Sequence, residues 1–198
     1  MISYNCFYWG PILYKTKITA EILQNIKKIC KKNPKKSHVK NLAGDIKHEY
    51  LINEKILNKL LQPYIESFRE AYLNWYGNPI NPVFVNRCWV NYMKPGDYNP
   101  VHTHTGCDFS GVIYLDIPSK LQKEISEYQG NHDGPGAIYF LYGETNSYCI
   151  TNISSKPVAG DIYIFPYGLK HAVNPHKSNC ERVSIGVNFA VKGGIHDK

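Results

Sequence analysis

The sequence lacks the patterns that mark several common classes of protein. Its six cysteines are scattered, and none belongs to a C-x-x-C pair, so a structural zinc site is not expected. Their mostly apolar surroundings predict buried, reduced thiols. No apolar run approaches the length of a bilayer span, and Met1–Trp9 has no basic region followed by a long apolar stretch. We therefore expect a soluble protein without membrane partners, located in the cytoplasm.

Two common enzyme motifs are also missing. There is no G-x-S-x-G elbow, which argues against a serine hydrolase of that type. The glycine-rich stretch Gly134-Pro135-Gly136 is not followed by Lys-Ser or Lys-Thr, so it is expected to form a turn and not a phosphate-binding loop.

The composition is that of one ordinary globular domain. Hydrophobic residues make up 43% of the 198 residues and charged residues 20%, which argues against disorder. Aromatic residues reach 13%, with 16 tyrosines, which favours strands and ligand pockets over a helical bundle. The net charge is +7, and six lysines gather between Lys27 and Lys36. This cluster predicts either a solvated helix end or a surface that contacts nucleic acid.

The order of the predicted elements indicates helices followed by strands, within a single domain that spans residues 1–198. Residues 1–80 are expected to be mostly helical support, with one helix capped by Thr19 and a second that runs from about Asn53 to Tyr76 and is kinked or broken at Pro63. From residue 81 to 192, short aromatic and β-branched segments alternate with turns, which predicts a jelly-roll core. The predicted strands are Phe84–Met93, Ser110–Asp116, Ala137–Tyr142, Asp161–Phe165 and Arg182–Val191.

Histidines supply the strongest indication of chemistry. His102 and His104 are two residues apart, so on a β-strand both imidazoles point to the same face. Asp108 shares their parity if the strand stays regular. His171 is expected in a loop at the end of a distant apolar strand. Together these side chains predict an open metal site in a β-barrel, suited to iron(II), manganese or zinc.

Arg182 and Ser184 form the second candidate group. On the last predicted strand they face the same way, while the residue between them faces the other. A buried guanidinium needs an anionic partner, because an unpaired charge inside a protein is costly. The partner is either Asp161 or Glu181, or a dicarboxylate ligand held by two hydrogen bonds from the guanidinium and one from Ser184.

The three motifs, in this order, resemble the 2-oxoglutarate/Fe(II) oxygenases related to the prolyl-hydroxylase-like branch. The motifs are H-x-H before an SGVIYL strand, then F-P-x4-H, then R-x-S. The similarity extends from Trp9-Gly10-Pro11 through WVNYMKPGDYNPVHTH to the final strand. It includes uncharacterised members found in marine phages, which would place the protein in the cytoplasm of a host cell.

The resemblance implies a double-stranded β-helix and a dioxygenase that uses Fe(II), O2 and 2-oxoglutarate, with ascorbate as a stimulant. Such an enzyme hydroxylates a prime substrate, here unidentified, and releases succinate and CO2. The resemblance makes His102 and His171 iron ligands. It makes Arg182, with Ser184, the anchor of the distal 2-oxoglutarate carboxylate, and Tyr92 a candidate hydrogen-bond partner of that carboxylate.

The third iron ligand departs from the family pattern. An Asp or Glu usually stands two residues after the first histidine, and here that position is His104. Either His104 takes the place of the carboxylate or Asp108 bends in to supply it.

Two other functions fit the same residues. The spacing of the histidines and Asp108 is also similar to the two cupin motifs, which implies a metalloenzyme that does not use 2-oxoglutarate. Arg182 and Ser184 favour 2-oxoglutarate over this alternative. The other candidate is a non-catalytic jelly-roll module that binds a ligand, such as nucleic acid through the Lys27–Lys36 region.

Overall fold

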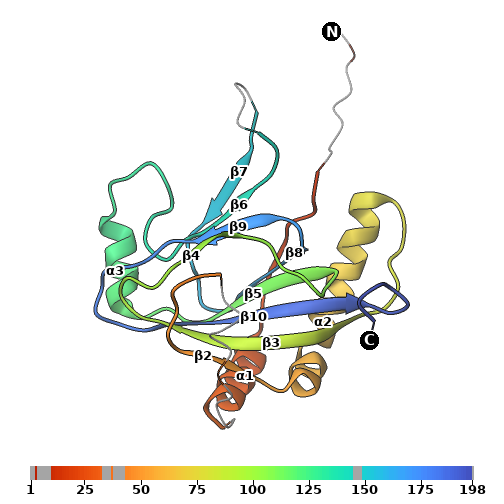
Figure 1. Ribbon diagram of the computed structural model, residues 1–198, viewed down its shortest axis with the longest axis horizontal. Helices are drawn as coiled ribbons and strands as arrows, with labels where there is room; N and C mark the ends of the chain where they lie inside the picture. The colour runs from red at the N-terminus through yellow and green to blue at the C-terminus, as the bar shows by residue number, and fades with distance from the viewer. Residues whose placement is uncertain (1–2, 4–9, 33–36, 38–42, 145–148, 198) are drawn as a thin grey trace.

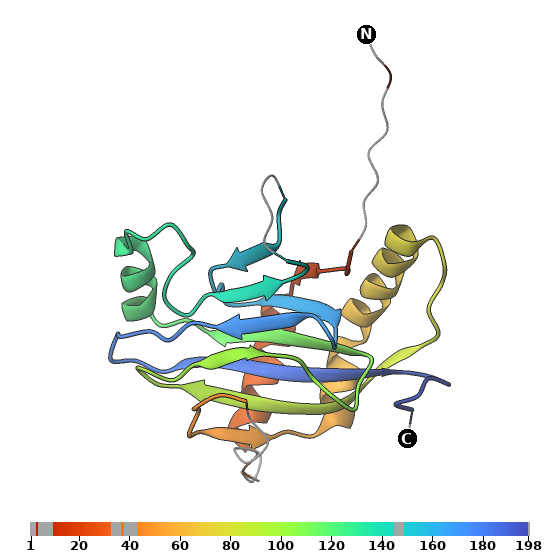
Figure 2. The ribbon, with the colours of Figure 1, turned by 45° about the horizontal axis from the view of Figure 1, so that its top comes forward.

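Two antiparallel β-sheets face each other in the middle of the molecule (Figures 1 and 2). The computed structural model describes residues 3, 10–32, 37, 43–144 and 149–197. The major sheet has the strand order β1 (Tyr14–Lys17), β8 (Asp161–Pro166), β5 (Phe109–Asp116), β10 (Arg182–Val191), β3 (Val83–Met93) and β2 (Glu49–Leu51). The minor sheet has the order β4 (Asn99–His102), β9 (Lys170–Val173), β6 (Ile138–Leu141) and β7 (Asn152–Ser155). This arrangement confirms the predicted mainly β, double-stranded β-helix class with N-terminal helices.

The major sheet separates two hydrophobic cores, because alternate side chains of its strands point to opposite faces. The outer core packs the sheet against the helices α1 (Ala20–Lys32) and α2 (Glu54–Tyr76), seen behind it in Figure 2. The inner core fills the space between the two sheets and includes Tyr114 and Phe165 of the major sheet and Phe140 of the minor sheet. A third helix, α3 (Ser119–Glu127), covers one end of the molecule (Figure 1).

Both long helices begin where the sequence predicts, and α2 also ends there. Thr19 caps α1 by accepting the backbone N–H of Ile22 at 3.4 Å, and Asn53 caps α2 by accepting that of Ile56 at 3.0 Å. Gly77 ends α2 with φ at 75°, a left-handed conformation that glycine adopts without steric cost.

Of the two alternatives predicted at Pro63, a kink or a break, the break is wrong. Helix α2 continues through the proline from Glu54 to Tyr76. Its buried face lies on both sides of Pro63 and comprises Leu57, Leu61, Ile65 and Phe68. Packing of these residues against the sheet offsets the backbone hydrogen bond that proline cannot donate.

The structure contains all five predicted strands and adds five short ones. Strands β1 and β2 come from the part expected to be helical, and they form the two edges of the major sheet. Strands β4, β7 and β9 complete the minor sheet. Each of these five strands has only three or four residues, too few for alternation to stand out in the sequence.

The described part of the lysine-rich region lies away from the space between the sheets. Its first four lysines belong to α1, on the outer face of the major sheet, where Lys27 pairs with Asp116 at 3.6 Å. Lys35 and Lys36 fall outside the described residues, so a nucleic-acid surface here stays a prediction. Within the described ranges no helix combines the length and hydropathy needed to cross a bilayer. The described cysteines are free thiols, and Cys6 lies outside the described residues.

Candidate active site

Three histidines meet between the sheets. His102 is the last residue of β4 and pairs directly with His171 of β9, so the minor sheet itself places these two rings side by side. The expected loop position of His171 is therefore wrong. The prediction that His102 and His104 share a strand is also wrong, because β4 ends at His102 and His104 follows in the loop. The backbone N–H of His104 donates to Tyr167 O at 3.0 Å, and this contact holds the loop against the end of β8.

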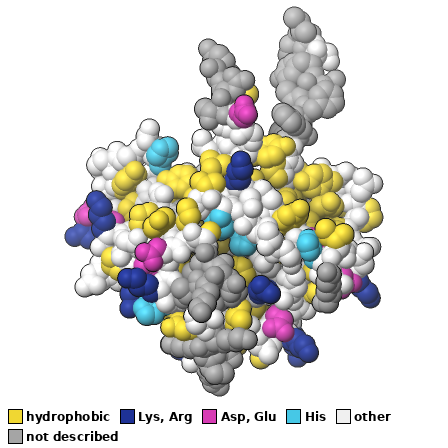
Figure 3. All heavy atoms as spheres, viewed as in Figure 1, with side chains coloured by type: hydrophobic (Ala, Val, Ile, Leu, Met, Phe, Trp, Pro, Cys, Tyr) yellow, Lys and Arg dark blue, Asp and Glu magenta, His cyan; other side chains and the backbone are white. Residues whose placement is uncertain are grey.

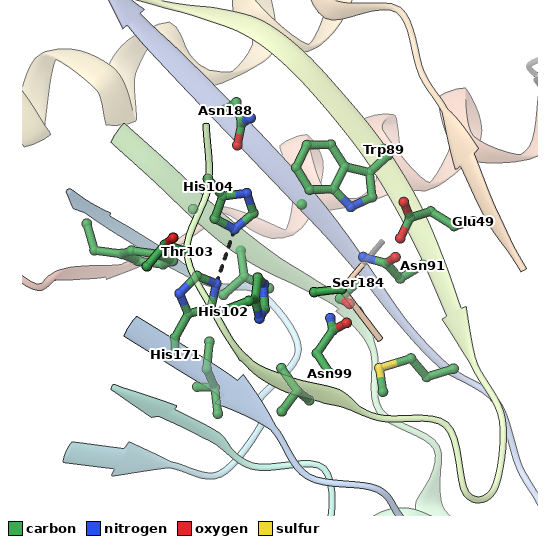
Figure 4. A pocket seen from close by; sticks show the side chains of 18 of the residues that line it. Glu49, Trp89, Asn91, Asn99, His102, Thr103, His104, His171, Ser184 and Asn188 are labelled. Carbon is green, nitrogen blue, oxygen red and sulfur yellow. Dashed lines mark hydrogen bonds between the residues drawn. The ribbon is translucent and has the colours of Figure 1, made fainter. Parts of the chain in front are cut away.

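The three rings converge on one point. One ring nitrogen from each of His102, His104 and His171 lies within 4.8 Å of the other two, as in a metal site. His104 Nε2 lies 3.1 Å from His171 Nε2, and the two rings are stacked at 9° with their centroids 5.0 Å apart (Figure 4). Figure 3 shows histidine side chains in the middle of one face, among apolar and uncharged groups.

Backbone carbonyls fix which nitrogens face the centre. His102 Nδ1 donates to Pro100 O at 2.8 Å, and His171 Nδ1 donates to Leu169 O at 2.9 Å. The Nε2 atoms of both rings are thereby left as lone-pair donors. Burial lowers the pKa of all three rings, and repulsion between the rings lowers it further for His104, to about 4, and for His171, to about 3. The cluster is therefore neutral near pH 7, which is the form that binds metal.

Asp108 does not join the cluster, which corrects the alternative that it supplies the carboxylate ligand. Its Oδ2 accepts the backbone N–H of Val191 at 2.8 Å, at the end of β10. The backbone of Asp108 pairs with Phe189 and Tyr167. These bonds hold the carboxylate at the ends of the central strands β5 and β10. Among the described residues, His104 takes the third position of the group.

Arg182 is buried in the same cavity and has no acidic partner among the described residues. Its side chain is 2% exposed, Nη1 donates to Gly136 O at 2.8 Å, and Nη2 contacts Met93 Sδ. Nε has no hydrogen-bond partner. Asp161, one of the anionic partners considered from the sequence, pairs with Lys15 at 2.9 Å instead. Burial lowers the pKa of Arg182, so the site has a desolvated cation that lacks an anion.

Ser184 and Tyr114 lie beside Arg182. They are directly opposite each other in the pairing of β10 with β5, so both point to the inner face. The guanidinium carbon of Arg182 is 5.5 Å from the centroid of the Tyr114 ring. Tyr114 Oη is buried without a hydrogen-bond partner, and burial raises the pKa of this phenol to about 12. Tyr114 was missed from the sequence, although its even spacing from Ser110 places it on the inner face of β5.

Tyr92 is on the wrong face for the role that the resemblance gave it. On β3 its neighbours Asn91 and Met93 point into the cavity, so Tyr92 points to the outer core. There its ring packs on Tyr50, with centroids 6.2 Å apart. The alternation of the strand therefore excludes Tyr92 from the group around Arg182, and Tyr114 lies where Tyr92 was expected.

The histidines and Arg182 line one cavity of about 280 Å³. Its wall also contains a set of residues that the sequence did not single out: Glu49, Trp89, Asn91, Asn99 and Asn188 (Figure 4). Glu49 comes from the three-residue strand β2, inside the part predicted to be helical, and no motif marks it. The cavity is large enough for a small dicarboxylate together with part of a substrate.

Gly186 makes room for the aromatic wall of this cavity. A Cβ at residue 186 would lie 2.4 Å from Cε2 of the Trp89 indole, which packs against the strand at this position. We expect Gly186→Ala to lower the free energy of unfolding by about 1–3 kcal/mol, because the indole has to move. Urea denaturation measures the change. Gly168→Ala, where a Cβ would meet nothing within 4 Å, is the control, and equal stability of the two variants would contradict the packing.

Buried Glu49 makes stability depend on pH. Burial raises the pKa of its carboxyl from 4.5 to about 8, so stability falls as pH rises from 4.5 to 8, because ionisation is easier in the unfolded chain. Glutamine cannot ionise. We expect Glu49→Gln to be more stable than the wild type by on the order of 3 kcal/mol at pH 8, and by little at pH 4.5. Urea denaturation at both pH values tests this, and a gain that did not grow with pH would contradict it.

Comparison with known proteins gives the class of this site. A family model described as "Putative 2OG-Fe(II) oxygenase" matches residues 87–188, somewhat more than half of the chain. The matched region runs from β3 to β10 and includes the three histidines, Arg182 and Ser184. The chain therefore belongs to this family of 2-oxoglutarate/Fe(II) oxygenases, and the predicted family is confirmed. No curated protein sequence matches the chain.

Solved structures share the fold. An oxidoreductase of the 2OG-Fe(II) oxygenase family from Burkholderia pseudomallei has a TM-score of 0.61 at 16% identity, covering 91% of this chain and 85% of its own. A Pseudomonas putida prolyl-4-hydroxylase has a TM-score of 0.54 at 16% identity over 90% and 91% of the two chains. The viral collagen prolyl hydroxylase of Paramecium Bursaria Chlorella virus-1 has 0.54 at 15% over 89% and 94%. At these identities the likeness establishes the double-stranded β-helix fold alone.

Proposed function

We propose that the protein is a dioxygenase that uses Fe(II) and 2-oxoglutarate to hydroxylate a substrate, with release of succinate and CO2. The observation that carries the proposal is the pairing of two incomplete sites in one cavity. Among the described residues, three neutral imidazoles converge with no carboxylate in their group, and the buried guanidinium of Arg182 in the same cavity has no acid paired with it. A divalent metal and a dicarboxylate complete both sites at once.

His102, His104 and His171 would hold the iron. The backbone bonds to Nδ1 of His102 and His171 aim Nε2 of each ring at a common point, and burial keeps the rings unprotonated. Three neutral ligands leave the charge of a divalent ion unbalanced, which favours an anionic cosubstrate. Three protein ligands also leave coordination positions open.

Arg182 would hold the far carboxylate of 2-oxoglutarate, with Ser184 and Tyr114. The fit rests on orphaned atoms: Arg182 Nε and Tyr114 Oη are both buried and lack partners, and each can donate one hydrogen bond. Charge-assisted bonds from a guanidinium are stronger than neutral ones, and the dry surroundings strengthen them further. When bound, iron and 2-oxoglutarate would together activate O2, which is the oxidant for hydroxylation. The protein's own share is to position both groups and to keep water out.

The test is succinate formation by purified protein supplied with Fe(II), ascorbate, O2 and 2-oxoglutarate. We expect slow 2-oxoglutarate-dependent succinate release even without the prime substrate, and none after chelation of the metal. Turnover of a substrate that proceeded equally well without 2-oxoglutarate would overturn the proposal.

One observation favours a second candidate. The third position of the metal group is His104 and not the family's usual carboxylate, and histidine-rich donor sets also suit metalloenzymes of the cupin type. Such an enzyme would need no dicarboxylate, so its metal binding and turnover would be unchanged in Arg182→Ala. A cytoplasmic location and contact with nucleic acid stay predictions under either function.

A further inference from the structure

Glu49 is a buried acid in the wall of the candidate active site. It belongs to β2 and is the register partner of Asn91 on β3, so both side chains point into the cavity. The residue is 0% exposed. Figure 4 shows its carboxylate next to Asn91 and on the far side of Trp89 from His104. Of the described residues that line the cavity, Glu49 is the only acid.

Three buried side-chain oxygens lie here without a hydrogen-bond partner among the described residues. Neither carboxylate oxygen of Glu49 has a hydrogen-bond partner, and Asn91 Oδ1 has none either. Burial of an acceptor without a partner costs free energy, and burial also raises the pKa of Glu49, so that its protonated form is favoured until a cation lies beside it. A ligand rich in N–H groups would satisfy all three atoms.

Glu49 does not serve the metal. Among the described residues, the group whose ligand atoms lie within 4.8 Å of one another contains the three histidines and no carboxylate. Trp89 stands between Glu49 and His104, with the Trp89 and His104 ring centroids 5.9 Å apart (Figure 4). Glu49 therefore lies within the cavity but outside the coordination sphere, where part of a substrate would lie.

Trp89 adds a second feature that suits a cation. Its indole packs against Gly186 and lines the same cavity as the acid. The face of an indole attracts ammonium and guanidinium groups, and the attraction grows when water is excluded. An acid next to an aromatic wall thus offers a charge partner and a π surface to the same ligand.

We propose that Glu49, Asn91 and Trp89 bind a positively charged nitrogen of the prime substrate, an ammonium or a guanidinium group. The inference rests on the proposed function, because it takes the other end of the substrate to lie beside the three histidines. It assigns the prime substrate to the class of basic side chains and amines. Ser184 and Arg182 remain for the cosubstrate, so the two buried ionisable groups of opposite sign in the cavity wall, Glu49 and Arg182, select two different ligands.

The test uses matched pairs of probes that differ only in charge. N-acetyl-L-argininamide is compared with N-acetyl-L-citrullinamide, and N-acetyl-L-lysinamide with N-acetyl-L-norleucinamide. Binding is measured by calorimetry with and without Mn(II) and 2-oxoglutarate. For the wild type we expect at least one cationic probe to bind about tenfold or more tightly than its neutral partner, which corresponds to the loss of one charged contact.

Variants decide whether Glu49 is responsible. In Glu49→Gln the preference for the cationic probe should fall to about one, and in Glu70→Gln, an exposed acid on α2, it should persist. No preference in the wild type, or a preference that survives in Glu49→Gln, would overturn the inference. Binding of 2-oxoglutarate is measured in the same samples. If Glu49→Gln still binds it, a failed charge preference leaves the proposed function standing, whereas loss of 2-oxoglutarate binding in every sample counts against the proposed function instead.

Discussion

His171→Ala should lose the bound divalent metal and, with it, all 2-oxoglutarate-dependent succinate formation. His171 is the most buried of the three rings, its Nδ1 is fixed by Leu169 O, and its Nε2 faces His104. Removing it leaves two ligands, so we expect metal affinity to fall by at least about 100-fold. Metal content after dialysis, measured by elemental analysis, reports the loss.

Asp108→Asn is the matched control for this prediction. The Asp108 carboxylate accepts the backbone N–H of Val191, and an asparagine oxygen can accept the same bond. Metal content should therefore stay at the wild-type level. If Asp108→Asn lost the metal and His171→Ala kept it, the ligand set proposed from the geometry would be wrong.

Arg182→Ala should weaken the binding of 2-oxoglutarate by about 30-fold to 1000-fold and leave the metal in place. The guanidinium is desolvated, so its bond to a carboxylate is worth about 2–4 kcal/mol when one partner is truncated. Calorimetric titration of 2-oxoglutarate into protein loaded with Mn(II) measures the effect. Stability should change less than for other buried residues, because Arg182 has no acid in the described structure and its removal also removes a buried charge.

Arg182→Lys separates charge from geometry. Lysine keeps the positive charge but cannot make the paired bonds of a guanidinium, so its affinity for 2-oxoglutarate should fall between those of the wild type and Arg182→Ala. Succinate as the titrant supplies a dicarboxylate without the keto group. Unchanged affinity for 2-oxoglutarate in Arg182→Ala would favour the cupin-type alternative.

Strand alternation explains which site residues could be found from the sequence. Arg182 and Ser184 lie on a ten-residue strand, long enough for the period of two to show, and both face the cavity as predicted. The role predicted for Tyr92 was wrong for the same physical reason. The odd-numbered residues of β3 line the cavity, and Tyr92 has an even number. That parity becomes visible only once Met93 is seen opposite Arg182, and the pairing of strands is a property of the fold.

Short elements account for most of what the sequence could not reveal. His171 lies on a four-residue strand and Glu49 on a three-residue strand, so neither segment shows a periodicity that would identify it. His104 reaches the site from a loop, held by a backbone bond to Tyr167. Its place in the cluster was predicted from the presence of the other two histidines and not from the local sequence pattern. No feature of the sequence predicted that Glu49 would be buried in the cavity, because an isolated glutamate is ordinarily exposed.

Pro63 shows the converse, a local rule overridden by packing. Proline disfavours a helix interior, yet buried residues before and after it hold α2 as one helix against the major sheet. Asp108 is another case: regular alternation would have aimed it at the histidines, but its hydrogen bond to the end of β10 fixes it elsewhere. Tertiary contacts decided both positions.

The most direct test of a shared site is the affinity for 2-oxoglutarate with and without metal, measured on one protein preparation by calorimetry. If the three imidazoles and Arg182 serve the same bound pair, Mn(II) should tighten 2-oxoglutarate binding by about tenfold or more, and 2-oxoglutarate should tighten Mn(II) binding by the same factor. Equal affinities in the presence and absence of the ion would show that the two groups of residues do not act on one ligand.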